Sequence, residues 1–268
     1  MPEPEPQDAA CPECEGRGWV IVEDSGSGTA RPCDCRKRRL ATRLLTAAGI
    51  PERYAACTLE GFRTAGFPGA SEGLAASRLV QARTRAQRYV DEFLGPDGRF
   101  RELGLLFIGP PGTGKTHLAV AVLSQLVRRW GVSGRFVDFT SLLHQIQATF
   151  DPGSADSKSR ILDPVIGADV LVLDELGAQK PTPWVQDVLY LIINTRYTER
   201  RATLFTTNYR LRLPQPASAE SGEDFTLLER RISPQLVSRL YEMAEAVRLD
   251  AVEDYRRVVK TRERHLVG

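Results

Sequence analysis

Long apolar runs are missing from this chain of 268 residues. The longest, Leu118 to Leu123, is far too short to span a bilayer, so no membrane partner is expected. A signal peptide is also missing, because the N-terminus is rich in proline and glutamate instead of apolar residues. We therefore expect a cytoplasmic protein whose residues 1–10 are disordered.

A large excess of charge of one sign is missing too, since the net charge is only +2. No overall electrostatic field therefore indicates a nucleic-acid partner. The basic residues are instead bunched at 36–39, at 200–201 and in a C-terminal tail, residues 256–268. Such clusters permit DNA binding, and they are equally consistent with solvated helix faces.

No cysteine follows residue 57, so all five lie in the N-terminal fifth and mark a boundary near residue 50. The pairs Cys11-x2-Cys14 and Cys33-x-Cys35 supply four thiolates, enough for a tetrahedral Zn²⁺ site. In a reducing compartment, metal binding is favoured over disulfides. The second pair is more closely spaced than usual, which leaves an iron–sulfur site or a cluster without metal as alternatives. Cys57 is expected to be a buried small apolar residue.

Residues 109–116 read Gly-Pro-Pro-Gly-Thr-Gly-Lys-Thr, the G-x-x-x-x-G-K-[ST] spacing of a phosphate-binding P-loop. Glycines let backbone N–H groups approach a triphosphate, Lys115 supplies a cation for its β and γ phosphates, and Thr116 supplies a hydroxyl for Mg²⁺. An apolar run at 105–108 and a helical pattern at 117–129 give the strand–loop–helix context of this motif. The sequence therefore predicts ATP or ADP with Mg²⁺ as ligands.

Two acids, Asp174 and Glu175, follow the apolar run 170–173 and look like a Walker B element. In that reading Asp174 holds Mg²⁺ through water and Glu175 polarises the attacking water, whereas the alternative is a plain strand terminus. Asn208 closes a later strand, and polar side chains at the carboxyl edge of an open α/β sheet lie where ligands bind. A turn-forming asparagine is the alternative there.

Five short apolar segments are expected to form strands, with helical patterns between them. They are residues 105–108, 135–139, 170–173, 203–206 and 246–249. The predicted fold class is therefore α/β, a five-stranded parallel sheet flanked by helices. The other expected elements are helices at 36–48 and 74–94 and polar loops at 24–30, 151–160 and 208–224.

Several segments together resemble the DnaC/DnaI-type helicase loaders and the related IstB transposition helpers, which are AAA+ ATPases of the initiator clade. The resemblance covers about residues 50 to 255. The segments are Lys115 to Ala119, Leu173 to Gly177, Ile192 to Tyr197, Thr206 to Asn208 and Ser238 to Leu240. Ser233 and Pro234, an N-cap and first-turn pair, are expected to begin the helix that carries Arg239.

The resemblance implies an ATPase whose turnover is slow and stimulated by a partner or by DNA. It implies catalytic roles for Lys115, Asp174, Glu175, Asn208 as sensor 1, and Arg239 as an arginine finger reaching a neighbouring subunit's nucleotide. Thr116 and Asp174 would hold Mg²⁺. The nucleotide-binding set comprises Tyr54, Gly109, Pro110, Pro111, Gly112, Thr113, Gly114, Lys115, Thr116 and His117. We find no convincing sensor 2 arginine after residue 250, and the sequence ends before a full lid domain could form, so a complete lid domain is not expected.

The function favoured by the resemblance is a DNA replication protein that loads a hexameric replicative helicase onto single-stranded DNA and self-associates through its nucleotide interface. Lys158 and Arg160 lie where the clade carries a helical insertion facing DNA, and a solvated loop is the alternative. An IstB-like transposition helper and a nucleotide-gated adaptor with negligible turnover stay as alternatives, although the cysteine module is foreign to typical helpers. The expected organisation is a disordered N-terminus at 1–10, a zinc module and basic helix at 11–49, an AAA+ ATPase domain at 50–255 and a basic tail at 256–268.

Overall fold

A computed structural model describes residues 11–24, 27–64, 73–150, 157–211, 227–249 and 254–255. The predicted disordered N-terminus and the predicted basic tail lie outside the described residues. The same holds for residues 151–156 and 212–226, which make up much of two of the expected polar loops.

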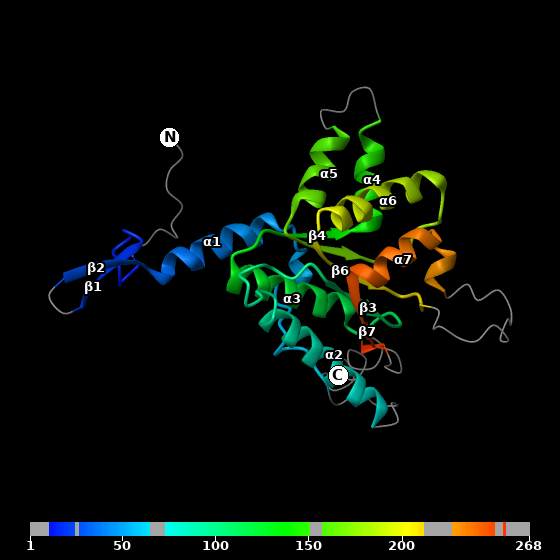
Figure 1. Cartoon of the computed structure of the whole chain (residues 1–268). Helices are drawn as coiled ribbons and strands as arrows, with labels where there is room; N and C mark the ends of the chain where they lie inside the picture. The colour runs from blue at the N-terminus through cyan, green and yellow to red at the C-terminus, as the bar shows by residue number, and fades with distance from the viewer. Residues whose placement is uncertain are drawn as a thin grey trace, which may run out of the picture.

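The centre of the fold is a parallel sheet of five strands in the order β4-β5-β6-β3-β7 (Figure 1). Its strands are β3 Gly104–Ile108, β4 Gly134–Asp138, β5 Val170–Asp174, β6 Ala202–Thr207 and β7 Ala244–Arg248. The apolar runs form these strands because both faces of the sheet are covered, which leaves little room for polar side chains. The predicted α/β class and parallel sheet are confirmed, with strand bounds shifted by one or two residues.

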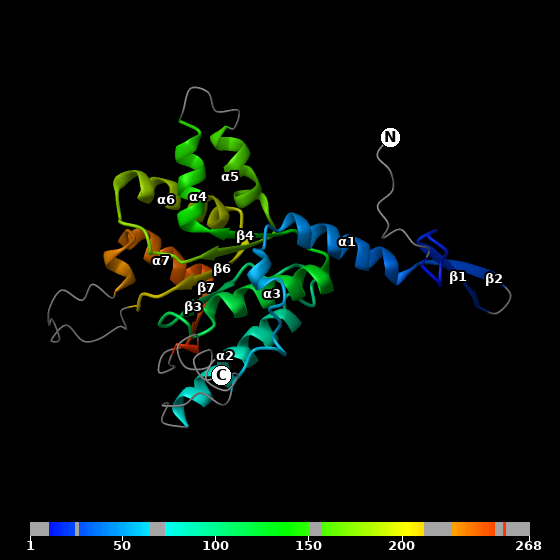
Figure 2. The same ribbon diagram turned by 180° about the vertical axis from the view of Figure 1, so that it is seen from behind.

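Helices cover the two faces of the sheet as separate layers (Figures 1 and 2). Alternate residues of β3 enter different cores: Leu105 and Phe107 pack with α2 and α3, whereas Leu106 and Ile108 pack with the helices of the other layer. The first layer is α2 Leu74–Asp91 and α3 Lys115–Trp130. The second is α4 Phe139–Ala148, α5 Lys158–Gly167, α6 Pro183–Thr198 and α7 Pro234–Met243. Short 3-10 turns lie at Glu52–Tyr54 and Leu228–Arg230.

Two of the sequence expectations concern helices of the second layer. A helical insertion was expected at residues 140–166, and the described part of this segment holds most of α4 and α5, with Lys158 and Arg160 exposed in the first turn of α5. Helix α7 begins as predicted, because the Ser233 side chain accepts a hydrogen bond from the Leu236 N–H and Pro234 occupies the first turn. The expected loop at 151–160 is wrong for residues 158–160, which form the first turn of α5 behind the Ser157 N-cap, and the role of Lys158 and Arg160 in DNA binding stays a prediction.

A buried arginine ties α6 to the edge of this layer. Arg196 has no exposed surface, and it donates hydrogen bonds to the backbone oxygens of Ile166 (2.8 Å), Ala168 (2.7 Å) and Ala202 (2.7 Å). Burial lowers the pKa of its guanidinium to about 9. Because one side chain bonds the α5–β5 connection and the start of β6, it fixes two neighbouring strands relative to α6. In the sequence this arginine belongs to the family-like segment 192–197, and no local pattern predicts its burial.

The N-terminal segment forms a hairpin and a long helix. Strands β1 Trp19–Asp24 and β2 Ser27–Pro32 pair antiparallel, and α1 Asp34–Ala47 follows at once. The expectation of a loop over 24–30 is therefore wrong for residue 24, which ends β1, and for residues 27–30, which pair with the β-branched run that precedes them. The predicted helix at 36–48 is confirmed, beginning two residues earlier than expected.

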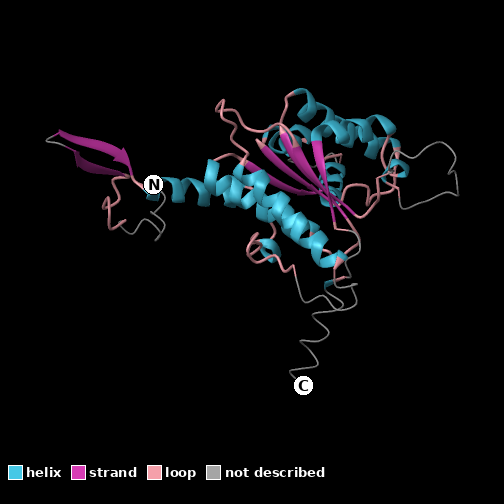
Figure 3. Ribbon diagram, turned by 60° about the horizontal axis from the view of Figure 1, so that its bottom comes forward, coloured by secondary structure: helices cyan, strands magenta, loops and turns pink. Residues whose placement is uncertain are grey.

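Helix α1 leaves the sheet and carries the hairpin at its far end (Figures 1 and 3). Its C-terminal end is anchored to β4 through hydrogen bonds from the Phe136 N–H to the Ala48 oxygen (2.7 Å) and from the Arg135 guanidinium to the Ala47 oxygen (3.0 Å). Among the described helices, none is both long enough and apolar enough to cross a membrane.

Candidate nucleotide site and cysteine cluster

The P-loop joins the carboxyl end of β3 to the first turn of α3. Gly112 and Gly114 have φ values of +75° and +92°, a left-handed backbone that favours glycine. Gly114 is the N-cap of α3, so the amides of the loop and of the first helical turn form the kind of surface that binds phosphate. Lys115 folds back over the loop and donates a hydrogen bond to the Pro110 oxygen at 2.7 Å.

The carboxylate of Asp174 connects this loop to the central strands. Its Oδ1 accepts hydrogen bonds from the Thr116 hydroxyl (2.9 Å) and from the Thr206 hydroxyl at the end of β6 (2.6 Å). Burial raises the pKa of Asp174, and the two hydroxyl donors act in the opposite direction by favouring the charged form. A hydroxyl and a carboxylate in contact are hard oxygen donors that suit Mg²⁺, so Thr116 and Asp174 fit the predicted ion.

Thr206 orients both acids at the end of β5. While its hydroxyl donates to Asp174, it accepts a hydrogen bond from the Glu175 N–H at 3.0 Å. Glu175 itself has φ +60°, unusual for a residue other than glycine, so its backbone is held in a strained turn. The sequence prediction did not include Thr206 among the functional residues. The signal available for it was a hydroxyl residue near the carboxyl end of a strand, two positions before Asn208. The side chain of Asn208 itself is exposed, just beyond β6.

A second missed residue, Arg231, holds the turn that follows Glu175. Its guanidinium donates to the oxygens of Gly177 (2.8 Å), Ala178 (3.1 Å) and Gln179 (2.9 Å). Because one side chain donates to three backbone oxygens, it fixes the path of the chain directly after the two acids. No signal in the sequence indicated this contact, because 52 to 54 positions separate Arg231 from the atoms it binds.

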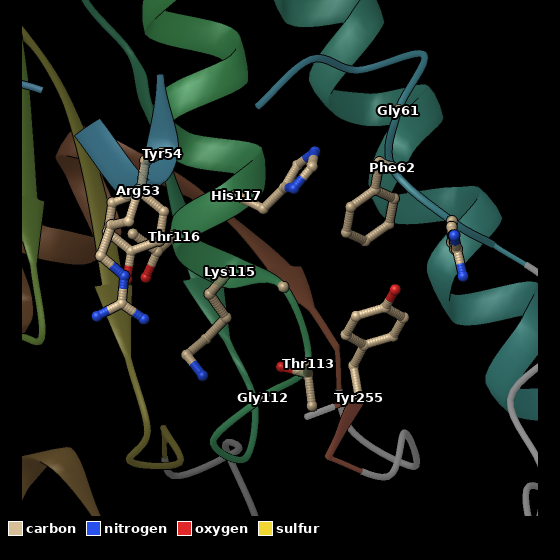
Figure 4. Close-up of a pocket in the computed structure, with 12 residues that line it drawn as sticks. Arg53, Tyr54, Gly61, Phe62, Gly112, Thr113, Lys115, Thr116, His117 and Tyr255 are labelled. Atoms are coloured by element: carbon tan, nitrogen blue, oxygen red, sulfur yellow. The ribbon is translucent and has the colours of Figure 1, made fainter. Parts of the chain in front are cut away.

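A cavity of about 250 Å³ lies beside the P-loop (Figure 4). Tyr54 and His117, both predicted to bind nucleotide, line it together with the P-loop residues 112–116. Two further rings, Phe62 and Tyr255, lie on the other side of the cavity from Tyr54. The Tyr255 N–H donates to the Gly112 oxygen at 3.1 Å, which places this distant residue on the loop. Aromatic rings beside a phosphate loop form a surface on which a purine base can stack.

Arg239 lies away from this cavity, on α7. Its guanidinium carbon is 4.9 Å from the Tyr190 ring centroid and 5.8 Å from that of Tyr197, and its Nη2 donates to the Tyr190 hydroxyl at 3.3 Å. The described part of the chain therefore brings together Lys115, Thr116 and Asp174 but leaves Arg239 on the outer side of the α6–α7 layer. Arg239 is not among the residues that line this cavity, and its role as an arginine finger stays a prediction.

Four cysteine sulfurs gather at the base of the hairpin. The Sγ atoms of Cys11, Cys14, Cys33 and Cys35 all lie within 4.8 Å of one another, and three of these residues are buried. Cys33 is the N-cap of α1 and Cys35 lies in its first turn, which explains how a pair with one intervening residue converges on the cluster. An all-thiol set of this size fits Zn²⁺.

A hydrogen bond to sulfur favours the thiolate form of Cys35, whereas the pKa of Cys33, although a backbone hydrogen bond lowers it, is raised to about 12 by burial and the neighbouring thiols. The Arg39 guanidinium donates to the Cys35 Sγ at 3.2 Å and lowers the pKa of that thiol, and the Gly18 N–H donates to the Cys14 Sγ at 3.2 Å. Cys57 lies outside the cluster and packs against the core between the sheet and helices α2 and α3. It is only half-buried, so the expectation of a buried residue is corrected, and its burial raises the pKa of its thiol.

The central sheet has five parallel strands, with a P-loop after β3 and two acids at the end of β5, which lies two strands from β3. This arrangement defines the class as a P-loop nucleotide-binding α/β protein. The family profile described as "IstB-like ATP binding protein" matches residues 51–220, and the chain belongs to this family.

Known proteins similar to this chain include the replicative helicase loader DnaC of Escherichia coli (strain K12), which is 30% identical over 166 residues. That alignment covers 62% of this chain and 61% of DnaC, less than two thirds of the relative's length. A crystal structure of the DnaC helicase loader superposes with a TM-score of 0.57 at 29% identity, covering 76% of this chain and 100% of that one. The crystal structure of DnaI has a TM-score of 0.54 at 21% identity over 75% of this chain and 94% of its own, and supports the fold alone.

Proposed function

We propose that this protein is an ATP-dependent loader of a hexameric replicative helicase. The observation that carries the proposal is the hydrogen bond that joins Thr116 of the P-loop to Asp174, in a chain that is similar to DnaC both in sequence and in structure. The cytoplasmic location stays a prediction.

The chemistry that the chain's residues can perform is phosphoryl transfer to water. The P-loop amides and Lys115 bind the β and γ phosphates, and Thr116 with Asp174 holds the cation that neutralises them when it is bound. Glu175 accepts a hydrogen bond from water and orients it toward the γ phosphate, with Asn208 as sensor 1. Tyr54, with the added rings of Phe62 and Tyr255, contacts the base.

The domain organisation given above is part of the proposal: a module at 11–49, an ATPase domain at 50–255, and terminal segments at 1–10 and 256–268. The cysteine cluster would hold Zn²⁺ and give the module a rigid core, since small modules with few apolar residues need such a clip. We propose that the module docks on the helicase. Lys158 and Arg160, both exposed in α5, are proposed as contacts to single-stranded DNA.

A transposition helper remains the second candidate, because the matching family profile carries the IstB name. In that role the ATPase domain would assemble on duplex DNA and recruit a transposase. The third candidate is an adaptor in which ATP sets the conformation and turnover is negligible. The three candidates share one nucleotide site and differ in the partner and in the need for hydrolysis, so they are separated by function and not by structure.

Loading can be measured with the resident replicative helicase, circular single-stranded DNA carrying an annealed forked strand, and ATP. We expect the protein to raise the unwinding rate, and Lys115→Ala to abolish the effect because it weakens phosphate binding. Glu175→Gln should bind ATP but fail to hydrolyse it, and so fail to begin another round of loading, since only the water-orienting group is lost. Full loading by Glu175→Gln would favour the adaptor. No effect on the helicase, together with ATP-dependent assembly on duplex DNA, would favour the transposition helper.

The metal of the module can be tested by elemental analysis of the purified protein. We expect about one zinc per chain, and loss of that zinc in Cys14→Ser with nucleotide binding intact, because the cysteine cluster and the sheet have separate cores. Cys57→Ser is the matched control, since it removes a thiol outside the cluster and should retain the metal. Iron instead of zinc, or no metal in the wild-type protein, would contradict the assignment.

The role of Arg239 can be tested by mixing two inactive variants. A finger acting on another subunit contributes roughly 10³- to 10⁵-fold to the rate, so Arg239→Ala and Lys115→Ala should each be nearly inactive. Mixed under conditions of assembly, some interfaces would pair an intact P-loop with an intact finger and restore turnover. If the variants assemble together and the mixture is no faster than its parts, Arg239 does not act in trans.

A further inference from the structure

A groove of about 330 Å³ between α2 and β7 is lined by arginines from both elements. Arg78 and Arg85 come from α2 and Arg248 comes from the end of β7. The rest of the lining is Gln81, Ala82, Ala246 and Val247, so neither an acidic nor an aromatic side chain of the described residues lines it. We propose that this groove binds the phosphodiester backbone of a nucleic acid strand.

The groove is built on the edge of the sheet, where β7 has no neighbouring strand among the described elements. Arg85 is braced against this edge: its Nη1 donates to the Ala246 oxygen at 3.0 Å and lies 3.4 Å from a carboxylate oxygen of Glu245. A guanidinium has five N–H donors in a fixed plane, so these contacts leave it able to bond an anion as well. The described lining of the groove carries three guanidinium groups and no carboxylate, and Glu245 lies beside it as the partner of Arg85.

The spacing of the arginines favours a polymer over a single phosphate ion. Arg78 and Arg85 are seven residues apart on one helix, which places their backbones about 10 Å apart along its axis at roughly 1.5 Å per residue. Successive phosphates of a strand can each bond a different arginine along the groove, Arg248 included, which a single phosphate ion cannot do. Because the lining holds no ring for base stacking, the contact would be independent of base sequence.

The opposite side of α2 provides an internal comparison. There, a cavity of about 720 Å³ is lined by Arg83 and Arg88 together with the acids Glu60, Asp91 and Glu92. The lining of that cavity thus mixes both signs of charge, whereas the described lining of the groove carries only positive charge. An anionic strand is attracted more strongly to the purely basic lining.

The groove also lies one strand from the P-loop. Strand β7 pairs with β3, and Arg248 is opposite Ile108, the last residue before the loop. The proposal rests on the groove and not on helicase loading, so it applies equally to a loader and to a transposition helper. It adds a DNA contact that is separate from Lys158 and Arg160, which lie on the other layer of helices.

Fluorescence anisotropy with a labelled oligo-dT of about 30 nucleotides and with a duplex of the same length tests this site over a range of salt concentrations. The double variant Arg78→Gln and Arg248→Gln should weaken binding about tenfold at low salt. The slope of log affinity against log salt should fall by about 0.7 for each lost contact with a single strand, or about 0.9 with a duplex. Arg85 is kept, because it braces β7.

The control variant Arg83→Gln with Arg88→Gln removes the same charge from the other side of α2 and should bind like the wild type. An equal loss in the control, or no loss in the test variant, would overturn the proposal. Displacement of the oligonucleotide by inorganic phosphate at constant ionic strength would also overturn it, by assigning the groove to a small anion.

ATP binding is measured on every sample as a check that the protein is folded. If the double variant does not bind ATP, the two single variants are used in its place. Helicase loading is assayed separately. A protein that binds DNA through this groove but loads no helicase would refute the proposed function and leave the groove assigned.

Discussion

The Asp174 carboxylate is held by hydroxyls from two separate elements, Thr116 at the start of α3 and Thr206 at the end of β6. This contact requires that β5, β6 and β3 lie side by side with their carboxyl ends at one edge, as the parallel sheet arranges them. A buried carboxylate without such donors would favour the neutral acid, which is a poor ligand for a cation. The order of the strands is therefore what makes the P-loop and the acids of β5 one site.

A feature of the fold or of the candidate site could be predicted from the sequence when a short, continuous stretch of residues indicates it. The P-loop, the acids after β5 and the five strands are written in short stretches, so the sequence alone predicted the fold class and the central part of the candidate site. Thr206, Phe62 and Tyr255 were missed because their roles depend on neighbours distant in the chain. That Thr206 faces Asp174 follows from the pairing of β5 with β6, and no local pattern specifies which strands pair.

The N-terminal module shows the same limit on a smaller scale. The cysteine spacing predicted a metal cluster, yet its short second pair looked irregular until the structure placed Cys33 and Cys35 at the beginning of α1. Helix α1 then separates the cluster from the sheet and anchors to β4 beside the P-loop helix. The same helix therefore carries the cysteine cluster at its first turn and contacts the nucleotide domain at its last.

The most direct test of the account is nucleotide binding by Thr206→Val and Thr206→Ser, titrated with and without Mg²⁺. Valine keeps the shape of the side chain and loses the hydroxyl, whereas serine keeps the hydroxyl. The account predicts that Thr206→Val loses roughly 10- to 100-fold in Mg²⁺ affinity while binding without Mg²⁺ persists, and that Thr206→Ser resembles the wild type. Unchanged Mg²⁺ dependence in Thr206→Val would contradict the claim that this hydroxyl builds the site.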